Sequence, residues 1–129
     1  MHTIKILIAI TAIAALIIGA SLFEGRLLRN DANNLGEKIS TIEKSTKQED
    51  WSMAEKNLNS VIDEWPKVEN KWSVILDHAE IDNIEDALIK VAAYIKAKDS
   101  TSALAELASL KNFINHIPEK EAFNLKNIF

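Results

Sequence analysis

The residues best suited to chemistry lie in one acidic segment, residues 77–86, which contains five carboxylates and one histidine but no basic side chain. Carboxylate oxygens and imidazole nitrogens bind divalent cations, so Asp77, His78 and Glu80 are candidate metal ligands. The segment lacks the ligand spacing and the glycine of a calcium-binding loop. In the alternative interpretation, Asp82 and its neighbours occupy the first turn of a helix, where carboxylates oppose the positive end of the helix dipole. We favour this structural interpretation.

A second histidine, His116, lies far from the acidic segment in the sequence. If the helices that carry His78 and His116 pack antiparallel, both imidazoles lie near helix ends and can share one site. The candidate metal or small-ligand site therefore comprises Asp77, His78, Glu80 and His116. A histidine near a helix C-terminus is more often a favourable partner of the dipole, and we favour that role for both.

Catalysis is not predicted. The chain contains no cysteine, which excludes thiolate nucleophiles, disulfides and cysteine-ligated metals. No serine lies in a nucleophile-elbow motif, and no glycine-rich phosphate loop is present. We therefore expect a protein that is not an enzyme and has no cofactor, and we assign no catalytic residue or metal ligand.

The N-terminal apolar segment, residues 6–23, contains no charged residue and follows a tail of residues 1–5. At about 1.5 Å per residue, a helix of this length spans roughly the hydrocarbon core of a bilayer. Lys5 before it, and Arg26 and Arg29 after it, can extend their charged groups to the two interfaces. The alternative is a signal peptide cleaved at the small residues near its end. Because the apolar run exceeds the usual signal-peptide core, we expect an uncleaved transmembrane anchor.

Charge limits the function further. The chain has 15 Lys and Arg against 19 Asp and Glu, without the concentrated basic face that a nucleic-acid binder requires, so we exclude that class. The basic residues that flank the apolar segment weakly favour a cytoplasmic domain. Acids interleave with those bases, however, and so short a tail tends to stay inside. We expect a single-pass protein of the cell membrane with an extracytoplasmic domain.

The elements that position these residues are expected to be helices, because the chain has only 3 Gly and 2 Pro to break them. Residues 24–47 carry apolar side chains in a seven-residue repeat, which predicts a juxtamembrane helix. Weak helix formers at residues 30–36 predict a hinge near the membrane. The remainder, residues 48–129, is predicted to form a helical bundle domain.

The strongest periodicity lies in residues 50–77. One core position of the heptad recurs every seven residues and is occupied by Trp51, Leu58, Trp65 and Trp72. Apolar residues also fill the second core position of each heptad. The pattern predicts one helix packed along its length and kinked at Pro66, where a backbone donor is missing. We favour core packing over a partner-binding groove for the tryptophans. Trp72, beside the acidic segment, is the one that we expect to be partly exposed.

Further helices are predicted downstream. Asp82 and Glu85 have the spacing of a capping box, which would start a helix that ends near Lys98. The next helix is expected to begin at residues 99–100 and to end at Pro118, which then occupies the first turn of a short last helix. The predicted fold class is all-α: a transmembrane helix followed by an antiparallel bundle of about four helices with a short C-terminal helix.

Four stretches of the C-terminal half carry a resemblance to one bacterial family: DHAEIDNIE at residues 77–85, SALAEL at 102–107, HIPEKE at 116–121 and LKNIF at 125–129. The chain is similar there to an uncharacterised family of small single-span helical proteins, whose domain is of unknown function. The resemblance covers most of the chain and implies an all-helical fold with an anchor. It implies no catalytic residues.

Together these observations predict a membrane-anchored helical module with a role in protein–protein interaction or in structural assembly. Its expected partners are the membrane and either another protein or a second copy of the chain. The alternative is a metal- or small-ligand-binding domain that uses Asp77, His78, Glu80 and His116.

Overall fold

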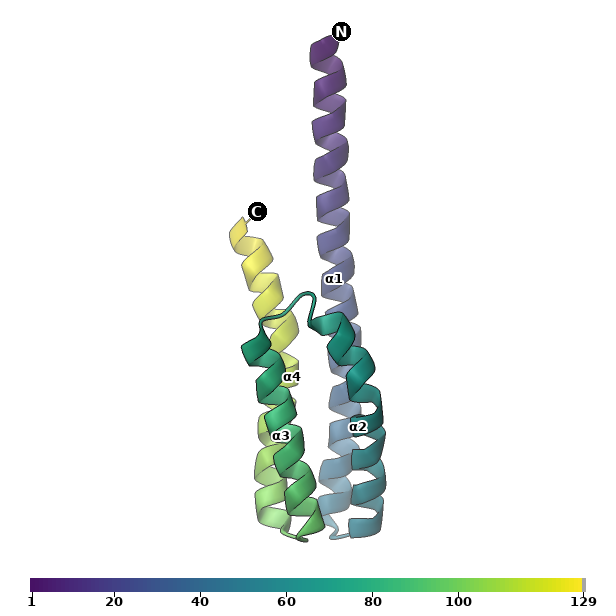
Figure 1. Cartoon of the computed structure of the whole chain (residues 1–129), viewed down its shortest axis with the longest axis vertical. Helices are drawn as coiled ribbons and strands as arrows, with labels where there is room; N and C mark the ends of the chain where they lie inside the picture. The colour runs from purple at the N-terminus through teal and green to yellow at the C-terminus, as the bar shows by residue number, and fades with distance from the viewer. Residues whose placement is uncertain (129) are drawn as a thin grey trace.

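The computed structural model describes residues 1–128, with the side chains of residues 1–119. In that part of the chain the elements are four helices and no strand: α1 (His2–Lys47), α2 (Trp51–Trp72), α3 (His78–Lys96) and α4 (Ser100–Ile128). Successive helices run in opposite directions, and the second half of α1 packs with the other three as a bundle. The first half of α1 projects from one end of that bundle (Figure 1). The predicted all-α fold class is confirmed.

Helix α1 joins two different environments in one uninterrupted run of 46 residues. The most apolar window, with a mean hydropathy of 2.7, is entirely unburied and is long enough to cross a membrane. From Leu28 onward one face of the same helix enters the core, with fully or almost fully buried side chains: Leu28, Ala32, Leu35, Ile39 and Ile42. The helix therefore supplies both a candidate membrane span and one wall of the bundle.

The hinge predicted at residues 30–36 is not formed, because α1 continues through it. The weak helix formers of that segment are held by other helices. Asn34 Nδ2–H donates to Glu64 Oε1 of α2 at 2.9 Å. A Cβ atom at the buried Gly36 would lie 3.5 Å from Asn115 Oδ1 of α4, an ordinary van der Waals distance, so α4 packs against this turn of α1. Tertiary contacts here outweigh a low helix propensity.

Helix α2 begins after Asp50, whose Oδ1 accepts a hydrogen bond from the Met53 amide at 3.2 Å, and runs through Pro66. It ends at Trp72 rather than at residue 77. The amides of Ile75 and Leu76 both donate to the Trp72 carbonyl, at 2.9 and 2.7 Å. These bonds add one helix-like turn after α2, in which Leu76 is buried, and the connection to α3 occupies residues 73–77.

The tryptophans of α2 belong to the core. Trp65 is 6% exposed and Trp72 is 0% exposed, and their rings meet edge to face with centroids 5.9 Å apart. The expectation that Trp72 is partly exposed is therefore wrong. The reason is that α1 covers this ring, and Asp31 of α1 accepts the Trp72 Nε1–H at 3.3 Å.

Helix α3 begins at His78, one turn before the predicted capping box at Asp82. Asp77 occupies the N-cap position, although its side chain makes no capping hydrogen bond. The side chain of Ile81 is only 4% exposed. Burial of this residue extends the apolar face of α3 by one turn and places Asp82 inside the helix.

Helix α4 starts after Asp99, whose Oδ1 accepts from the Ser102 amide at 3.1 Å. It continues through Pro118 to Ile128, so the separate short C-terminal helix is not formed. A proline removes one backbone hydrogen bond, and the buried Ile114 and Ile117 hold the preceding turn in the core. The last residue of the LKNIF stretch, Phe129, lies outside the described residues.

Candidate functional site

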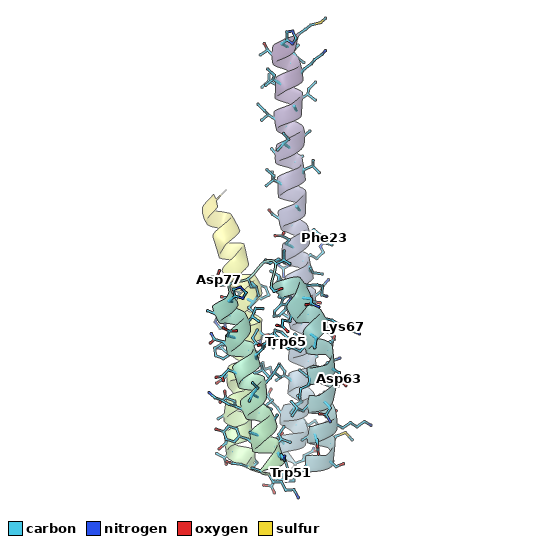
Figure 2. All side chains as sticks on the ribbon, in the orientation of Figure 1. Phe23, Trp51, Asp63, Trp65, Lys67 and Asp77 are labelled. Carbon is cyan, nitrogen blue, oxygen red and sulfur yellow. The ribbon has the colours of Figure 1, made fainter. Side chains whose placement is uncertain are left out.

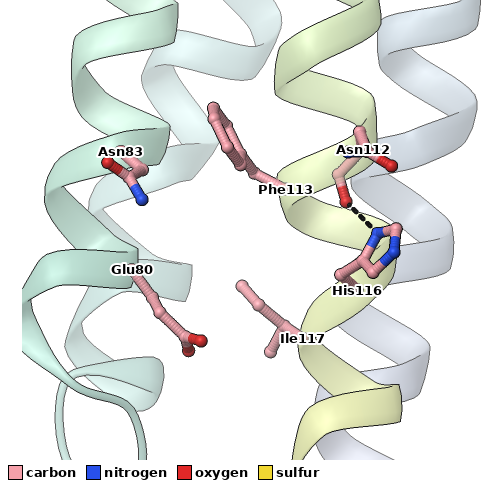
Figure 3. A pocket seen from close by; sticks show the side chains of 6 residues that line it. All are labelled: Glu80, Asn83, Asn112, Phe113, His116 and Ile117. Carbon is pink, nitrogen blue, oxygen red and sulfur yellow. Dashed lines mark hydrogen bonds between the residues drawn. The ribbon is translucent and has the colours of Figure 1, made fainter.

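A polar pocket of about 200 Å³ lies between α3 and α4 and contains two of the four predicted ligand residues. Its lining combines one carboxylate, two amides, one imidazole and two apolar side chains: Glu80, Asn83, Asn112, Phe113, His116 and Ile117. Figure 3 shows the Glu80 carboxylate extending from α3 into the space between the helices, opposite Phe113 and Ile117 from α4. The helices therefore bring Glu80 and His116 together at one pocket, from opposite walls.

The imidazole of His116 is oriented by its own helix. Its Nδ1 lies 2.9 Å from the Asn112 carbonyl oxygen, and because a carbonyl only accepts, Nδ1–H is the donor (Figure 3). This arrangement leaves Nε2 as the ring nitrogen that can accept a hydrogen bond from a ligand. His116 lines the pocket with a ring orientation fixed by its own helix, and its imidazole lies on the side of α4 away from Glu80 (Figure 3).

The other two predicted ligands, Asp77 and His78, do not line this pocket. Both are exposed at the start of α3. Among the described residues, no three His, Asp or Glu side chains are grouped closely enough to hold a metal ion. The geometry of the pocket suits a small polar molecule with an apolar part better than a metal ion, which needs several convergent ligands.

A second surface, the α2–α3 groove, was not singled out by the sequence. It has a volume of about 300 Å³, and its lining is mostly apolar: Ile62, Trp65, Glu85, Leu88, Ile89 and Ala92. Ile89 is 68% exposed and Ile62 is 40% exposed. Each follows a buried residue of the apolar stripe, Leu88 or Val61. An isoleucine placed just outside the heptad positions was the signal that could have revealed this groove.

A pair of carboxyl groups joins α2 to α3 beside the groove. Glu69 and Glu85 share a hydrogen bond, which raises the pKa of Glu69, and partial burial and the like charge of Glu85 raise this pKa further. Glu85 Oε1 also accepts the Trp65 Nε1–H at 3.3 Å. Two acids thus lie next to an indole, where a cation from a partner would relieve their like-charge repulsion.

The ion pairs between helices concentrate on α1. Among the described side chains, the interhelical pairs all involve α1: Lys38 with Glu64, Lys71 with Asp31 at 3.1 Å, and Lys111 with Glu43 at 3.0 Å. None of those described joins α2 to α3. The α2–α3 seam is joined instead by the hydrogen bond from Trp65 to Glu85 and by the Glu69–Glu85 pair.

One family model matches the chain, and it covers residues 22–128. Its description is Domain of unknown function (DUF4363). The chain belongs to this family. No curated protein and no solved structure matches the chain. The match confirms the resemblance to a family whose domain is of unknown function.

The matched region of this DUF4363 member begins where the apolar segment of α1 ends, and it includes both the polar pocket and the α2–α3 groove. Sequence reasoning found Glu80 and His116 because histidine and clustered acids are conspicuous residue types. It missed the groove and the Glu69–Glu85 pair, because both depend on the rotation of α2 against α3. Only the packed helices reveal which faces meet.

Proposed function

We propose that this chain is a membrane-anchored helical module that has no catalytic role and acts by binding a protein partner. The observation that carries the proposal is the continuity of α1. Its apolar residues 6–23 have no protein surface to cover them, while its second half is part of the bundle core. So large an unburied apolar surface is unfavourable in water, and a bilayer of matching thickness removes it from water.

The anchored module is proposed to stand on the extracytoplasmic side of the cell membrane. The tail before the apolar segment has only five residues and one lysine, Lys5. On the other side, Glu24 and Asp31 offset Arg26 and Arg29. A tail this short tends to stay in the cytoplasm, and the bundle then lies on the other side of the membrane.

The partner is proposed to bind at the α2–α3 groove, either as another protein or as a second copy of the chain. Ile62 and Ile89 expose apolar surface in the groove that the nearly buried Trp65 also lines. Adjacent apolar side chains around an aromatic ring are typical of the centre of a protein interface. The Glu69–Glu85 pair at the edge of the groove favours a partner that places a basic residue there.

The anchor is tested by fractionation. Full-length protein is expected to remain in the membrane pellet after an alkaline carbonate wash, whereas a variant without residues 6–23 should appear in the supernatant. The intact mass of the mature protein decides between an anchor and a signal peptide. A mature chain that begins near Leu22 would contradict the proposal.

The partner surface is tested by photocrosslinking in native membranes. A photoreactive residue at position 89 is expected to give a defined covalent product. The matched control is position 63, because Asp63 is exposed on α2 but does not line the groove. A product of twice the mass of the chain identifies self-association, and any other defined mass identifies a second protein. Equal labelling from both positions, or none from position 89, contradicts the groove as the partner surface.

The polar pocket favours a second candidate function, the binding of a small ligand. The observation behind it is that Glu80 and His116 line the same pocket. A ligand that binds there should raise the melting temperature of the full chain, and Asn83→Ala, which changes the pocket wall at an exposed residue, should weaken that effect.

A further inference from the structure

The two ends of the bundle differ in the chemistry of their connections. At the end far from the apolar segment, both connections are mainly polar, and each contains a charged residue with positive φ: Glu49 at 54° and Lys98 at 57°. The connection at the opposite end, residues 73–77, contains three consecutive apolar residues, Val74, Ile75 and Leu76. Surface turns normally consist of polar residues, glycine and proline. The apolar connection is therefore the unusual one.

Only one of these three side chains has no cover from the protein. Leu76 is 8% exposed and packs in the core, and Ile75 is partly buried against it. Val74 is 86% exposed, the largest exposure among the large hydrophobic side chains of residues 24–119. A valine at the tip of a connection adds nothing to the core, so its apolar surface is available to something outside the bundle.

The connection lies at the end of the bundle that faces the apolar segment. The hydrogen bond from Trp72 to Asp31 aligns the end of α2 with the part of α1 just below that segment. Along the long axis of the molecule, the connection reaches close to the level of the labelled Phe23 (Figure 2). The end of α4 extends further in the same direction (Figure 1). The connection thus reaches close to the plane where the apolar segment ends, and the end of α4 passes beyond that plane (Figures 1 and 2).

The continuity of α1 fixes where the connection lies relative to the apolar segment. Because α1 has no break between the apolar segment and the core, the bundle cannot turn independently of the segment without bending a helix that is packed from Leu28 onward. Arg26 and Arg29 are exposed on the intervening turns. Their guanidinium groups can form bidentate hydrogen bonds with phosphate.

We propose that this end of the bundle, formed by residues 73–77 and by the turns of α1 that carry Arg26 and Arg29, rests on the lipid surface. Val74 then lies at the boundary between head groups and acyl chains, and the two arginines bind lipid phosphates. The inference rests on the proposed anchor, since the apolar segment sets the plane of the bilayer. Its consequence is a second contact, which holds the α2–α3 groove at a fixed height and orientation above the membrane.

The absence of cysteine in the chain permits a direct test with single-cysteine variants of the full-length protein. Val74→Cys, Ile13→Cys and Asp63→Cys are each labelled with an environment-sensitive fluorophore and inserted into vesicles of phosphatidylcholine and phosphatidylglycerol. Some of the lipids carry a nitroxide quencher, either at the head group or near the end of the acyl chain. Ile13 reports on the apolar segment, and Asp63 is an exposed control on the side of α2. All three side chains are exposed, so the labels do not disturb the core.

The label at position 74 is expected to be quenched several-fold more by the head-group nitroxide than the label at position 63. The label at position 13 should be quenched mainly by the nitroxide deep in the acyl chain. If position 13 is quenched but position 74 is not, the anchor stands and the surface contact is refuted. If neither is quenched, the proposed anchor itself fails. A label at position 74 that is shielded from water yet insensitive to both nitroxides would show that a protein covers Val74, which also overturns the inference.

Discussion

Trp72 and Asp31, which are 41 positions apart in the chain, are joined by a hydrogen bond from the buried indole Nε1–H to the carboxylate Oδ2 at 3.3 Å. The same carboxylate forms an ion pair with the exposed Lys71 at 3.1 Å. One side chain of α1 thus satisfies a donor in the core and holds the last turn of α2. This contact aligns α2 with α1 at the end of the bundle nearest the apolar segment.

Removal of this acceptor should destabilise the bundle. Asp31→Ala leaves a buried indole N–H without a partner, which costs about 1–3 kcal/mol. Thermal unfolding of the full chain in detergent, followed by circular dichroism, measures the change. Lys71→Ala is the matched control, since an exposed ion pair contributes about 0–1 kcal/mol. An equal loss of stability in both variants would assign the effect to the ion pair rather than to the hydrogen bond from the indole.

The heptad stripe of α2 is the core that its periodicity predicted. Leu58 and Val61 are 3% and 1% exposed, so truncation to alanine leaves cavities. Leu58→Ala should cost about 2–5 kcal/mol, and Val61→Ala about 1–3 kcal/mol. Met53→Ala on the exposed side of the same helix should change the free energy of unfolding by about 0.5 kcal/mol or less. Denaturant midpoints that are the same for all three variants would contradict this assignment.

The Glu69–Glu85 pair predicts that acid stabilises the seam between α2 and α3. The hydrogen bond to Glu85 raises the pKa of Glu69 above its ordinary value of 4.5 in the folded chain. The folded state therefore binds more protons than the unfolded state between those two pKa values, and this contribution to stability is lost as pH rises through the folded pKa.

Glu69→Gln should remove this contribution, because glutamine remains neutral and can still donate a hydrogen bond to Glu85. The melting temperature of the variant, relative to that of the unmodified protein, should then increase as pH rises through the folded pKa of Glu69. Glu55→Gln, at an exposed position on α2, is the control and should leave the pH profile unchanged. If the melting temperature depends on pH in the same way with and without Glu69, the proposed hydrogen bond between Glu69 and Glu85 is ruled out.

Divalent cations are not expected to stabilise the chain. Asp77 and His78 lie outside the pocket that contains Glu80 and His116, so the four side chains do not converge on one point. A cation at a hundredfold excess over its dissociation constant would stabilise the fold by about 2.7 kcal/mol, which would raise the melting temperature by several degrees. Melts with and without Zn²⁺, Mn²⁺ or Ca²⁺ should coincide. A rise that disappears when His78 and His116 are both replaced by Gln would establish a metal site.

Helix boundaries show where local patterns stop being sufficient. The capping-box spacing at Asp82 and Glu85 is a real local signal, but burial of Ile81 moves the start of α3 to His78. In the same way, the weak helix formers near Gly36 and the proline at position 118 suggested breaks that packing overcomes. Each of these competing local preferences amounts to about 1–3 kcal/mol, which burial of a few apolar side chains can exceed.

The sequence by itself determined the all-helical fold, the heptad core of α2 and the presence of a segment that can span a membrane. These properties depend on composition, on the length of an apolar run and on its period, all of which are local along the chain. The tertiary structure alone decided that α1 is continuous, that Glu80 and His116 share a pocket, and that Glu69 meets Glu85 beside an exposed groove. Those relationships depend on how each helix is rotated and aligned against its neighbours, and side chains distant in the chain, such as Trp72 and Asp31, set that alignment.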